Sequence, residues 1–196
     1  MTGRGRNGIA AMTKIYLAGP DVFLPDAADW FARKRAICAA CQLTGVSPLD
    51  DLPGQPADWS SLPEWRRIAL RNEAHIRRCD AIIANLTPFR GASADSGTLV
   101  ELGWFLGQGR PVFGYSNTAT LFDIRSAAQV AAVPDPLPAL AVEGFSLPDN
   151  LMIPGAVEYG GGLPITLPPD GINRAFDALD VFELCVAAAA RRIAGR

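Results

Sequence analysis

Histidine is almost absent from the chain, and cysteine is sparse. The 196 residues include a single histidine, His75, and four cysteines, of which only Cys38 and Cys41 are closely spaced. A zinc site would need a second C-x-x-C or a pair of histidines, and this C-x-x-C lies inside a helical pattern. The sequence therefore gives no support for a metal site. We expect Cys38 and Cys41 to pack in the core, with a redox role as the alternative, and His75 to be a packing or surface residue.

A strong charge of either sign and a long apolar run are missing as well. The formal net charge is -2, and charged residues form no block, so binding to a nucleic-acid polymer or a membrane surface has no electrostatic support. No segment is long and apolar enough to span a bilayer, and the Gly/Arg-rich residues 1–12 lack the apolar run of a signal peptide. Without a signal or a disulfide framework, the expected location is the cytoplasm.

The chain does have the composition of a globular protein, with 49% hydrophobic and 19% charged residues. We expect residues 1–12 to form a flexible tail, with Met12 as the alternative start, and residues 13–196 to form one domain. Short β-rich runs alternate with helical patterns, which favours an α/β fold with an open parallel sheet and helices on both faces. The expected strands are 14–18, 46–48, 80–86 and 110–115, and the expected helices are 25–42, 62–78 and 96–107.

Two segments beyond the last expected strand have a different character. Residues 116–162 are rich in Pro, Ala, Gly and Asp, so we expect an irregular insertion apart from a helix near residues 121–130. Residues 171–194 are Ala-rich and are predicted to form a long C-terminal helix.

Glu101 is the one charged residue in a helix that is otherwise apolar on nearly every side. It lies in the stretch DSGTLVELGWF, residues 95–105, which Asp95 opens. A buried carboxylate is costly unless it is paired or used, whereas Asp95 would be favoured by the helix N-terminus. Both would lie at the carboxyl ends of the strands, where such sheets bind ligands, and two carboxyl groups suit substitution at a sugar carbon. The alternatives are that Asp95 is only a helix cap and Glu101 only an exposed glutamate.

Four stretches of the chain resemble the nucleoside 2-deoxyribosyltransferase family. They are KIYLAGPDVF at 14–23, CDAIIANLTPFRG at 79–91, DSGTLVELGWFLGQGRPVFGY at 95–115 and VEGFSLPDNLM at 142–152. The resemblance implies a flavodoxin-like sheet and a ping-pong exchange of bases on 2-deoxyribose, through a covalent ester and with retention of configuration. The substrates would be a deoxynucleoside and a free nucleobase, and neither a metal nor a cofactor would be needed.

The resemblance also assigns roles to individual residues. Glu101 would be the nucleophile that attacks C1′, Tyr16 would orient it through a hydrogen bond, and Asp95 would hold the sugar hydroxyls. Asn150 and Met152 would come from a neighbouring subunit to close the site around the 5′ end of the sugar, which implies a homo-oligomer with shared active sites. The further substrate-binding positions would be Gly19, Phe23, Asn72, Arg90 and Gly97.

Asn72 stands where some members of the family carry an aspartate that contacts the base. An amide can donate and accept hydrogen bonds, but it cannot protonate a leaving base. Either Glu73 supplies that acid or the base is handled differently, so the base preference stays open. The PFRG loop and residues 143–152 lean towards the purine-handling side of the family.

The alternative on the same fold is a hydrolase that removes the base from 2′-deoxynucleoside 5′-monophosphates with the same glutamate. Such an enzyme needs hydrogen-bond donors for a phosphate after the first strand. The loop there carries Asp21 and Asp26 and no basic residue, so it would repel a phosphate; Arg90 is the one obvious counter-argument. The transferase is the favoured interpretation, and a nucleotide-sensing module that needs no nucleophile is a second alternative.

Overall fold

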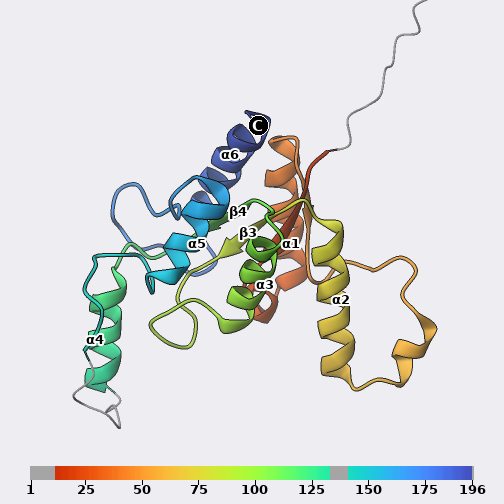
Figure 1. The fold of residues 1–196 in the computed structure, drawn as a ribbon, viewed down its shortest axis with the longest axis horizontal. Helices are drawn as coiled ribbons and strands as arrows, with labels where there is room; N and C mark the ends of the chain where they lie inside the picture. Colours follow the sequence, from red (N-terminus) through yellow and green to blue (C-terminus); the bar gives the residue numbers. More distant parts are fainter. Residues whose placement is uncertain (1–11, 133–140, 196) are drawn as a thin grey trace, which may run out of the picture.

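Four parallel strands form the centre of the structure, a computed structural model that describes residues 12–132 and 141–195. In spatial order they are β2 (Thr44–Val46), β1 (Lys14–Ala18), β3 (Ala81–Asn85) and β4 (Val112–Tyr115). Neighbouring strands pair in parallel, which confirms the predicted open sheet (Figure 1). Of the predicted tail, residues 1–11 lie outside the described part of the chain.

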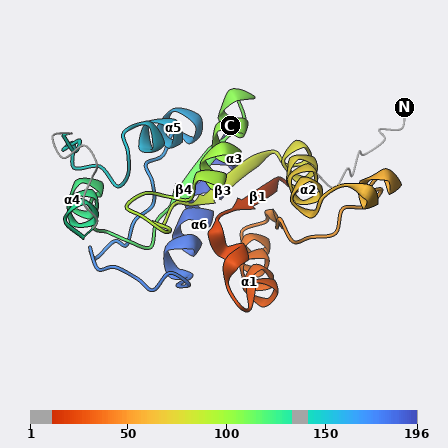
Figure 2. The same ribbon diagram turned by 90° about the horizontal axis from the view of Figure 1, so that it is seen from below.

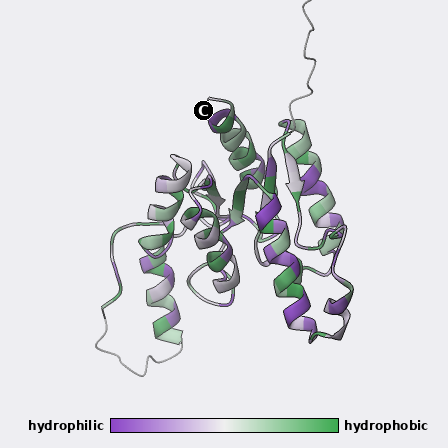
Figure 3. Ribbon diagram, turned by 45° about the vertical axis from the view of Figure 1, so that its right-hand side comes forward, coloured by the Kyte–Doolittle hydropathy of each residue, from purple (hydrophilic) through white to green (hydrophobic). Residues whose placement is uncertain are grey.

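Helices cover both faces of this sheet, as predicted (Figure 2). One face packs against α1 (Ala27–Ala40) and α6 (Asp180–Ala194). The other packs against α2 (Glu64–Arg78), α3 (Ser96–Gly107) and α5 (Met152–Gly161). Hydrophilic and hydrophobic segments alternate along α2, which has one side turned towards solvent (Figure 3). Because both faces are covered, β3 is buried along its whole length.

Successive side chains of β1 point to opposite faces, and this alternation places Tyr16. Ile15 and Leu17 join the core formed with α1 and α6, whereas Tyr16 joins the core formed with α2 and α3. Tyr16 lies opposite Val46 on one side and Ile82 on the other, in the middle of the sheet. Its position is therefore fixed by strands on both sides.

The second strand ends earlier than predicted, at Val46 instead of residue 48. The backbone N–H of Ser47 donates to Oδ2 of Asp50 at 2.9 Å, which starts a turn. Pro48 has no N–H to offer a neighbouring strand. Residues 46–48 looked like a strand by composition, but these two local constraints stop the pairing.

The prediction of an irregular insertion was wrong for α5. Its glycines suggested a loop, but they allow the helix to approach β4 closely. A Cβ at Gly161 would lie 2.1 Å from the carbonyl oxygen of Val112, a distance no side chain could tolerate. A second helix, α4 (Phe122–Ala132), confirms the one expected near residues 121–130 and lies at the edge of the molecule (Figure 1).

The C-terminal helix is shorter than predicted, because α6 begins only at Asp180. The side chain of Asn117, in the loop that follows β4, holds the segment before α6 in a non-helical path. Nδ2 of Asn117 donates to the carbonyl oxygens of Ala175, Phe176 and Ala178 at 3.1, 2.8 and 3.0 Å. Those carbonyls are thus satisfied without a helix.

Two other predictions concern packing. Cys38 is fully buried and Cys41 packs against the same core, and both thiols are free, as the core interpretation expected. Burial raises the pKa of Cys38 to about 12, so the thiol is a weak nucleophile. His75 is buried with Nε2 3.1 Å from the carbonyl oxygen of Asp50, which confirms a packing role.

Among the described residues, no helix is long and apolar enough to cross a membrane.

A buried ion pair lies under the loop that follows β1. Asp21 and Lys34 are only 1% and 2% exposed, and Nζ of Lys34 lies 2.8 Å from Oδ1 of Asp21. The same ammonium donates to the hydroxyl of Tyr115 at 2.8 Å, and Asn85 and Trp30 donate to the carboxylate. The pair is fully hydrogen-bonded, so neither charge is left without a partner.

Removing one member of this pair should destabilise the fold. Lys34→Met leaves the Asp21 carboxylate buried without its counter-charge, so the free energy of unfolding should fall by about 3–5 kcal/mol in urea denaturation. The double variant Asp21→Asn/Lys34→Met removes both charges and should recover much of that loss. A single variant as stable as the parent would contradict a structural role for the pair.

Candidate active site

A cleft of ≈ 480 Å³ opens beside the carboxyl ends of β1 and β2 and the first turn of α3. Its walls come from three parts of the chain: the loop after β1, the segment after β2 with the facing side of α2, and the start of α3. The lining residues are Gly19, Val22, Phe23, Pro48, Leu49, Trp65, Ile68, Arg71, Asn72, Asp95, Gly97, Thr98 and Glu101. The predicted end of the sheet therefore does carry a cavity.

Glu101 lies in the wall of the cleft, where Tyr16 of the core and Asn72 of the cleft lining contact its carboxylate. The hydroxyl of Tyr16 donates to Oε1 of Glu101 at 2.8 Å, and Nδ2 of Asn72 lies 3.5 Å from the same oxygen. Oε2 has no hydrogen-bond partner among the described residues. Burial raises the pKa of Glu101 to about 7; Asp95 adds to the rise, while the bonds from Tyr16 and Asn72 oppose it.

Asp95 both caps α3 and borders the cleft. Its Oδ2 accepts hydrogen bonds from the backbone N–H and the hydroxyl of Thr98, at 3.0 and 3.1 Å. Both cap bonds use the same oxygen, and Oδ1 has no hydrogen-bond partner among the described residues. A Cβ at Gly97 would lie 3.0 Å from Oδ2, so a larger residue there would crowd this carboxylate. The cap and a ligand role are therefore compatible.

The Phe23 ring lines the cleft and packs against groups outside it. Phe23 stacks on Phe89 with the ring centroids 5.4 Å apart. The guanidinium of Arg90 lies 4.9 Å from the Phe23 ring and 4.6 Å from the Phe89 ring. Arg90 does not line the cleft itself; its contact with the cleft is indirect, through the Phe23 ring that it packs against.

Asn72 lies on the α2 wall with its amide oxygen unused. Oδ1 of Asn72 is buried and has no hydrogen-bond partner among the described residues. Glu73 does not line the cleft and instead pairs with Arg77 at 2.6 Å on the surface of α2. The option that Glu73 supplies an acid to the base is therefore not supported by the geometry.

The comparison with known families decides what this cleft belongs to. Residues 15–152 match the sequence model described as "Nucleoside 2-deoxyribosyltransferase". The chain belongs to this family. The match covers almost all of the four strands, the cleft, Asp95 and Glu101, and it confirms the resemblance seen in the sequence.

Two solved structures and one curated relative are similar to this member of the nucleoside 2-deoxyribosyltransferase family. A "2-desoxiribosyltransferase from Leishmania mexicana" superimposes with a TM-score of 0.57 at 28% identity, covering 91% of this chain and 97% of that one. A conserved protein from Enterococcus faecalis V583, with a TM-score of 0.53, 21% identity and coverage of 92% and 99%, shares the fold. An uncharacterized protein of Schizosaccharomyces pombe is 35% identical over 109 residues, which are 55% of this chain and 52% of that protein. This chain thus spans about half the length of that curated relative.

Asn150 and Met152 do not reach the cleft of their own chain in this family member. They border a separate groove of ≈ 350 Å³ between α3 and α5, lined also by Leu99, Leu102 and Ile153 among others. Nδ2 of Asn150 donates to Glu143 at 2.6 Å, and Met152 is 71% exposed. The structure therefore separates these two residues from Glu101.

Asp149, directly before Asn150, ties that segment to the loop that leads into α3. The carboxylate is buried and accepts from the Ser93 hydroxyl at 2.5 Å and from the Ala94 backbone N–H at 3.0 Å. Arg125 of α4 lies 3.9 Å from its second oxygen. The segment before α5 and the loop before Asp95 therefore form one hydrogen-bonded unit.

The sequence predicted Asn72 on the α2 wall but not the other residues of that wall, and one acid was misjudged. Trp65, Ile68 and Arg71 line the cleft, and the amphipathic pattern of α2 was the signal that could have pointed to them. The expectation that Asp21 would repel a phosphate was wrong, because Asp21 is buried and paired with Lys34. Its counter-charge, Lys34, lies in α1 and not in the loop after β1.

The raised pKa of Glu101 predicts a pH-dependent cost to stability. Because the folded pKa of about 7 exceeds the ordinary value of 4.5, the folded state binds the proton more tightly. The free energy of unfolding should then fall as pH rises from about 4.5 to 7. Glu101→Gln removes this loss, so its advantage over the parent should grow across that window, by about 3 kcal/mol at most at 1.4 kcal/mol per pKa unit.

Urea denaturation of both proteins at pH 5 and pH 8.5 measures this difference. Glu158→Gln, on the exposed side of α5, is the matched control. An advantage of Glu101→Gln that is equal at the two pH values would show that the carboxyl group is not held in its protonated form by the fold.

Proposed function

We propose that the protein transfers 2-deoxyribose from one nucleobase to another, with Glu101 as the nucleophile. The observation that carries the proposal is the hydrogen bond of 2.8 Å that Tyr16 donates to Oε1 of Glu101 in the cleft wall. It fixes the carboxylate and leaves Oε2 for attack. The similar structure from Leishmania mexicana is described as a 2-desoxiribosyltransferase, which supports the same reaction for this chain.

Two half-reactions follow from this arrangement. Oε2 of Glu101 forms a bond to C1′ while the bond from C1′ to the base nitrogen breaks, and the bonding electrons leave with the base. The ring nitrogen of a second base then attacks C1′ and releases the carboxylate. Two inversions at C1′ retain the configuration.

The sugar itself contributes to the reaction. The transition state at C1′ has oxocarbenium character, which a neighbouring carboxylate stabilises. A 2′-hydroxyl would withdraw electrons from it, so a 2-deoxy sugar departs more readily. Asp95 would hold a sugar hydroxyl with Oδ1, and the rings around Phe23 would contact the base. The lean towards purines stays a prediction.

Glu101 must be ionised to act, and its pKa of about 7 sets the pH at which this happens. The ionised fraction rises with pH through neutrality, so the rate should rise from pH 6 to pH 8. The bond from Tyr16 keeps this transition from moving still higher.

Base exchange is the direct test. Purified protein with deoxyinosine and free adenine should yield deoxyadenosine, and thymidine with adenine tests a pyrimidine donor. Glu101→Ala should lower the rate by about 10³-fold or more, since a nucleophile is lost, whereas Glu158→Ala should not. Intact-protein mass spectrometry with a 2-fluoro-deoxynucleoside should show an adduct that Glu101→Ala lacks.

The alternative hydrolase on deoxynucleoside 5′-monophosphates has one observation in its favour, the neutralisation of Asp21 by Lys34. Against it, Arg71 is the only cation among the described residues that line the cleft, and it lies on the α2 wall away from the loop after β1. Equal release of base with and without an acceptor, together with preference for the 5′-phosphate, would establish the hydrolase. Unchanged function in Glu101→Ala would instead favour a nucleotide-sensing module.

We further propose that Asn150 and Met152 complete the cleft of a neighbouring subunit. They line the groove between α3 and α5 with Leu99 and Leu102, whereas Glu101 lines the cleft, and Met152 is an exposed apolar side chain. The expected assembly is a homo-oligomer with shared active sites.

Mixing two inactive variants tests this sharing. Glu101→Ala and the double variant Asn150→Ala/Met152→Ala should each be impaired, but subunit exchange between them should restore part of the activity by forming clefts with both intact halves. A mixture no more active than its parents, or a monomer by light scattering, would contradict shared sites.

A further inference from the structure

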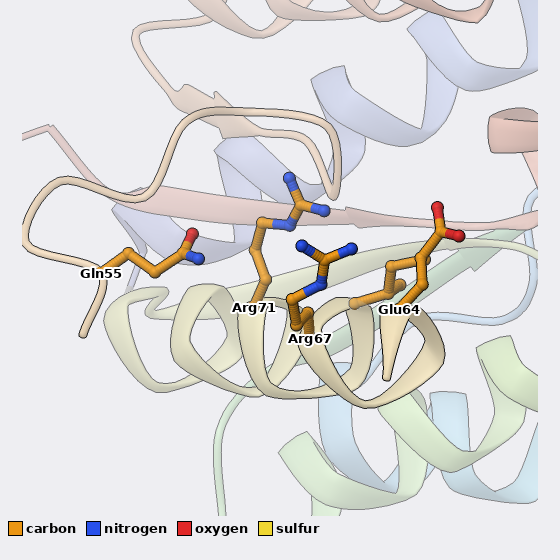
Figure 4. Close-up of a pocket in the computed structure, with 5 residues that line it drawn as sticks. Gln55, Glu64, Arg67 and Arg71 are labelled. Atoms are coloured by element: carbon orange, nitrogen blue, oxygen red, sulfur yellow. The ribbon is translucent and has the colours of Figure 1, made fainter. Parts of the chain in front are cut away.

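A second, more polar pocket adjoins the cleft on the α2 side. It has a volume of ≈ 200 Å³ and is lined by Gln55, Glu64, Arg67, Ile68 and Arg71. Ile68 and Arg71 line both this pocket and the cleft that contains Glu101. Figure 4 shows the guanidinium groups of Arg67 and Arg71 side by side, on the same side of α2.

Neither of these two cations is neutralised in the described part of the chain. Four other arginines of the described residues form ion pairs, among them Arg77 with Glu73 at 2.6 Å and Arg174 with Asp170 at 2.9 Å. The guanidinium groups of Arg67 and Arg71 form no ion pair or hydrogen bond with a described residue, although Glu64 lines the same pocket. Two like charges one helical turn apart repel each other, so an oxygen-bearing anionic group between them would be stabilised.

The residues that the cleft shares with the pocket indicate which part of a nucleoside would meet this pair. Glu101 and Asp95 mark the end where C1′ and the sugar lie under the proposed function. Leu49, Trp65 and Ile68 give the cleft an apolar lining, and Ile68 also lines the pocket. A base attached to C1′ and lying along this wall would direct its far edge to Arg71.

The chemistry at the edge of the base that is bonded to C1′ explains what a positive charge at its far edge would do. Asn72 stands near the nucleophile and has no proton to give to a departing base. The base nitrogen therefore keeps the bonding electrons, and the negative charge spreads to ring carbonyl oxygens where the base has them. A guanidinium beside such an oxygen stabilises that charge as it forms, and its fork can hold two acceptors at once.

We propose that Arg67 and Arg71 form an anion-stabilising subsite that binds the carbonyl-bearing edge of oxo bases, with Arg71 in direct contact and Arg67 reinforcing its charge. This assignment rests on the proposed function. On departure, the C1′–N bond breaks, the Glu101–C1′ bond forms, and the base anion held by Arg71 later takes a proton from water. An acceptor base follows the reverse course and gives its ring N–H proton to water before it attacks.

Hypoxanthine and adenine provide the test, since they differ at one position, where hypoxanthine has a carbonyl and adenine an amine. Arg71→Gln should lower kcat/KM for deoxyinosine at least about tenfold more than for deoxyadenosine, and Arg67→Gln should shift the ratio in the same direction by less. Arg66→Gln removes the same charge from an exposed position of α2 that lines neither pocket, and should leave the ratio unchanged. Equal losses for the two donors, or the same shift in Arg66→Gln, would overturn the proposal.

Binding measurements separate this proposal from the proposed function. Calorimetry with the Glu101→Gln protein should show tighter binding of hypoxanthine than of adenine, and the added substitution Arg71→Gln should abolish that preference. If this holds while no base exchange occurs, the subsite stands and the proposed function fails; if exchange occurs without the preference, the subsite fails. Inorganic phosphate that binds in an Arg67-dependent way without weakening hypoxanthine binding would also overturn it, since the pair would then serve a free anion.

Discussion

The hydrogen bond from Tyr16 to Glu101 joins the middle of β1 to α3, and the site depends on it. Tyr16 is held by parallel strands on both sides and lies against Phe105 of α3, with ring centroids 6.2 Å apart. A side chain fixed in this way gives the carboxylate a defined position. The same burial that fixes Glu101 also raises its pKa, so reactivity and stability oppose each other at this residue.

Much of the fold could be predicted because its elements follow simple periodicities. The apolar run of β3 and the capped, apolar α3 carry their structure in local sequence, and the Asp95–Glu101 spacing placed both acids at one cleft. The helix α5 could not be predicted, because the role of Gly161 depends on a strand about fifty residues away. The non-helical path before α6 likewise depends on Asn117, which is distant in sequence.

The candidate site was predictable in its chemistry and less so in its walls. Acids and a tyrosine could be identified from their motifs, whereas Trp65 and Arg71 look like exposed residues of an amphipathic helix until the segment after β2 is placed opposite them. Formal charge was similarly misleading at Asp21, whose effect on a ligand is removed by an ion pair with Lys34. Charge counted along a loop does not say which charges reach the solvent.

Asp149 has a consequence for how the two faces of α3 relate. One buried carboxylate holds both the loop that leads to Asp95 and the segment that presents Asn150. A displacement of either is therefore transmitted to the other through two or three short bonds. In an assembly with shared sites, the same few atoms of each subunit would align both Asp95 in its own cleft and Asn150, which it presents to its neighbour.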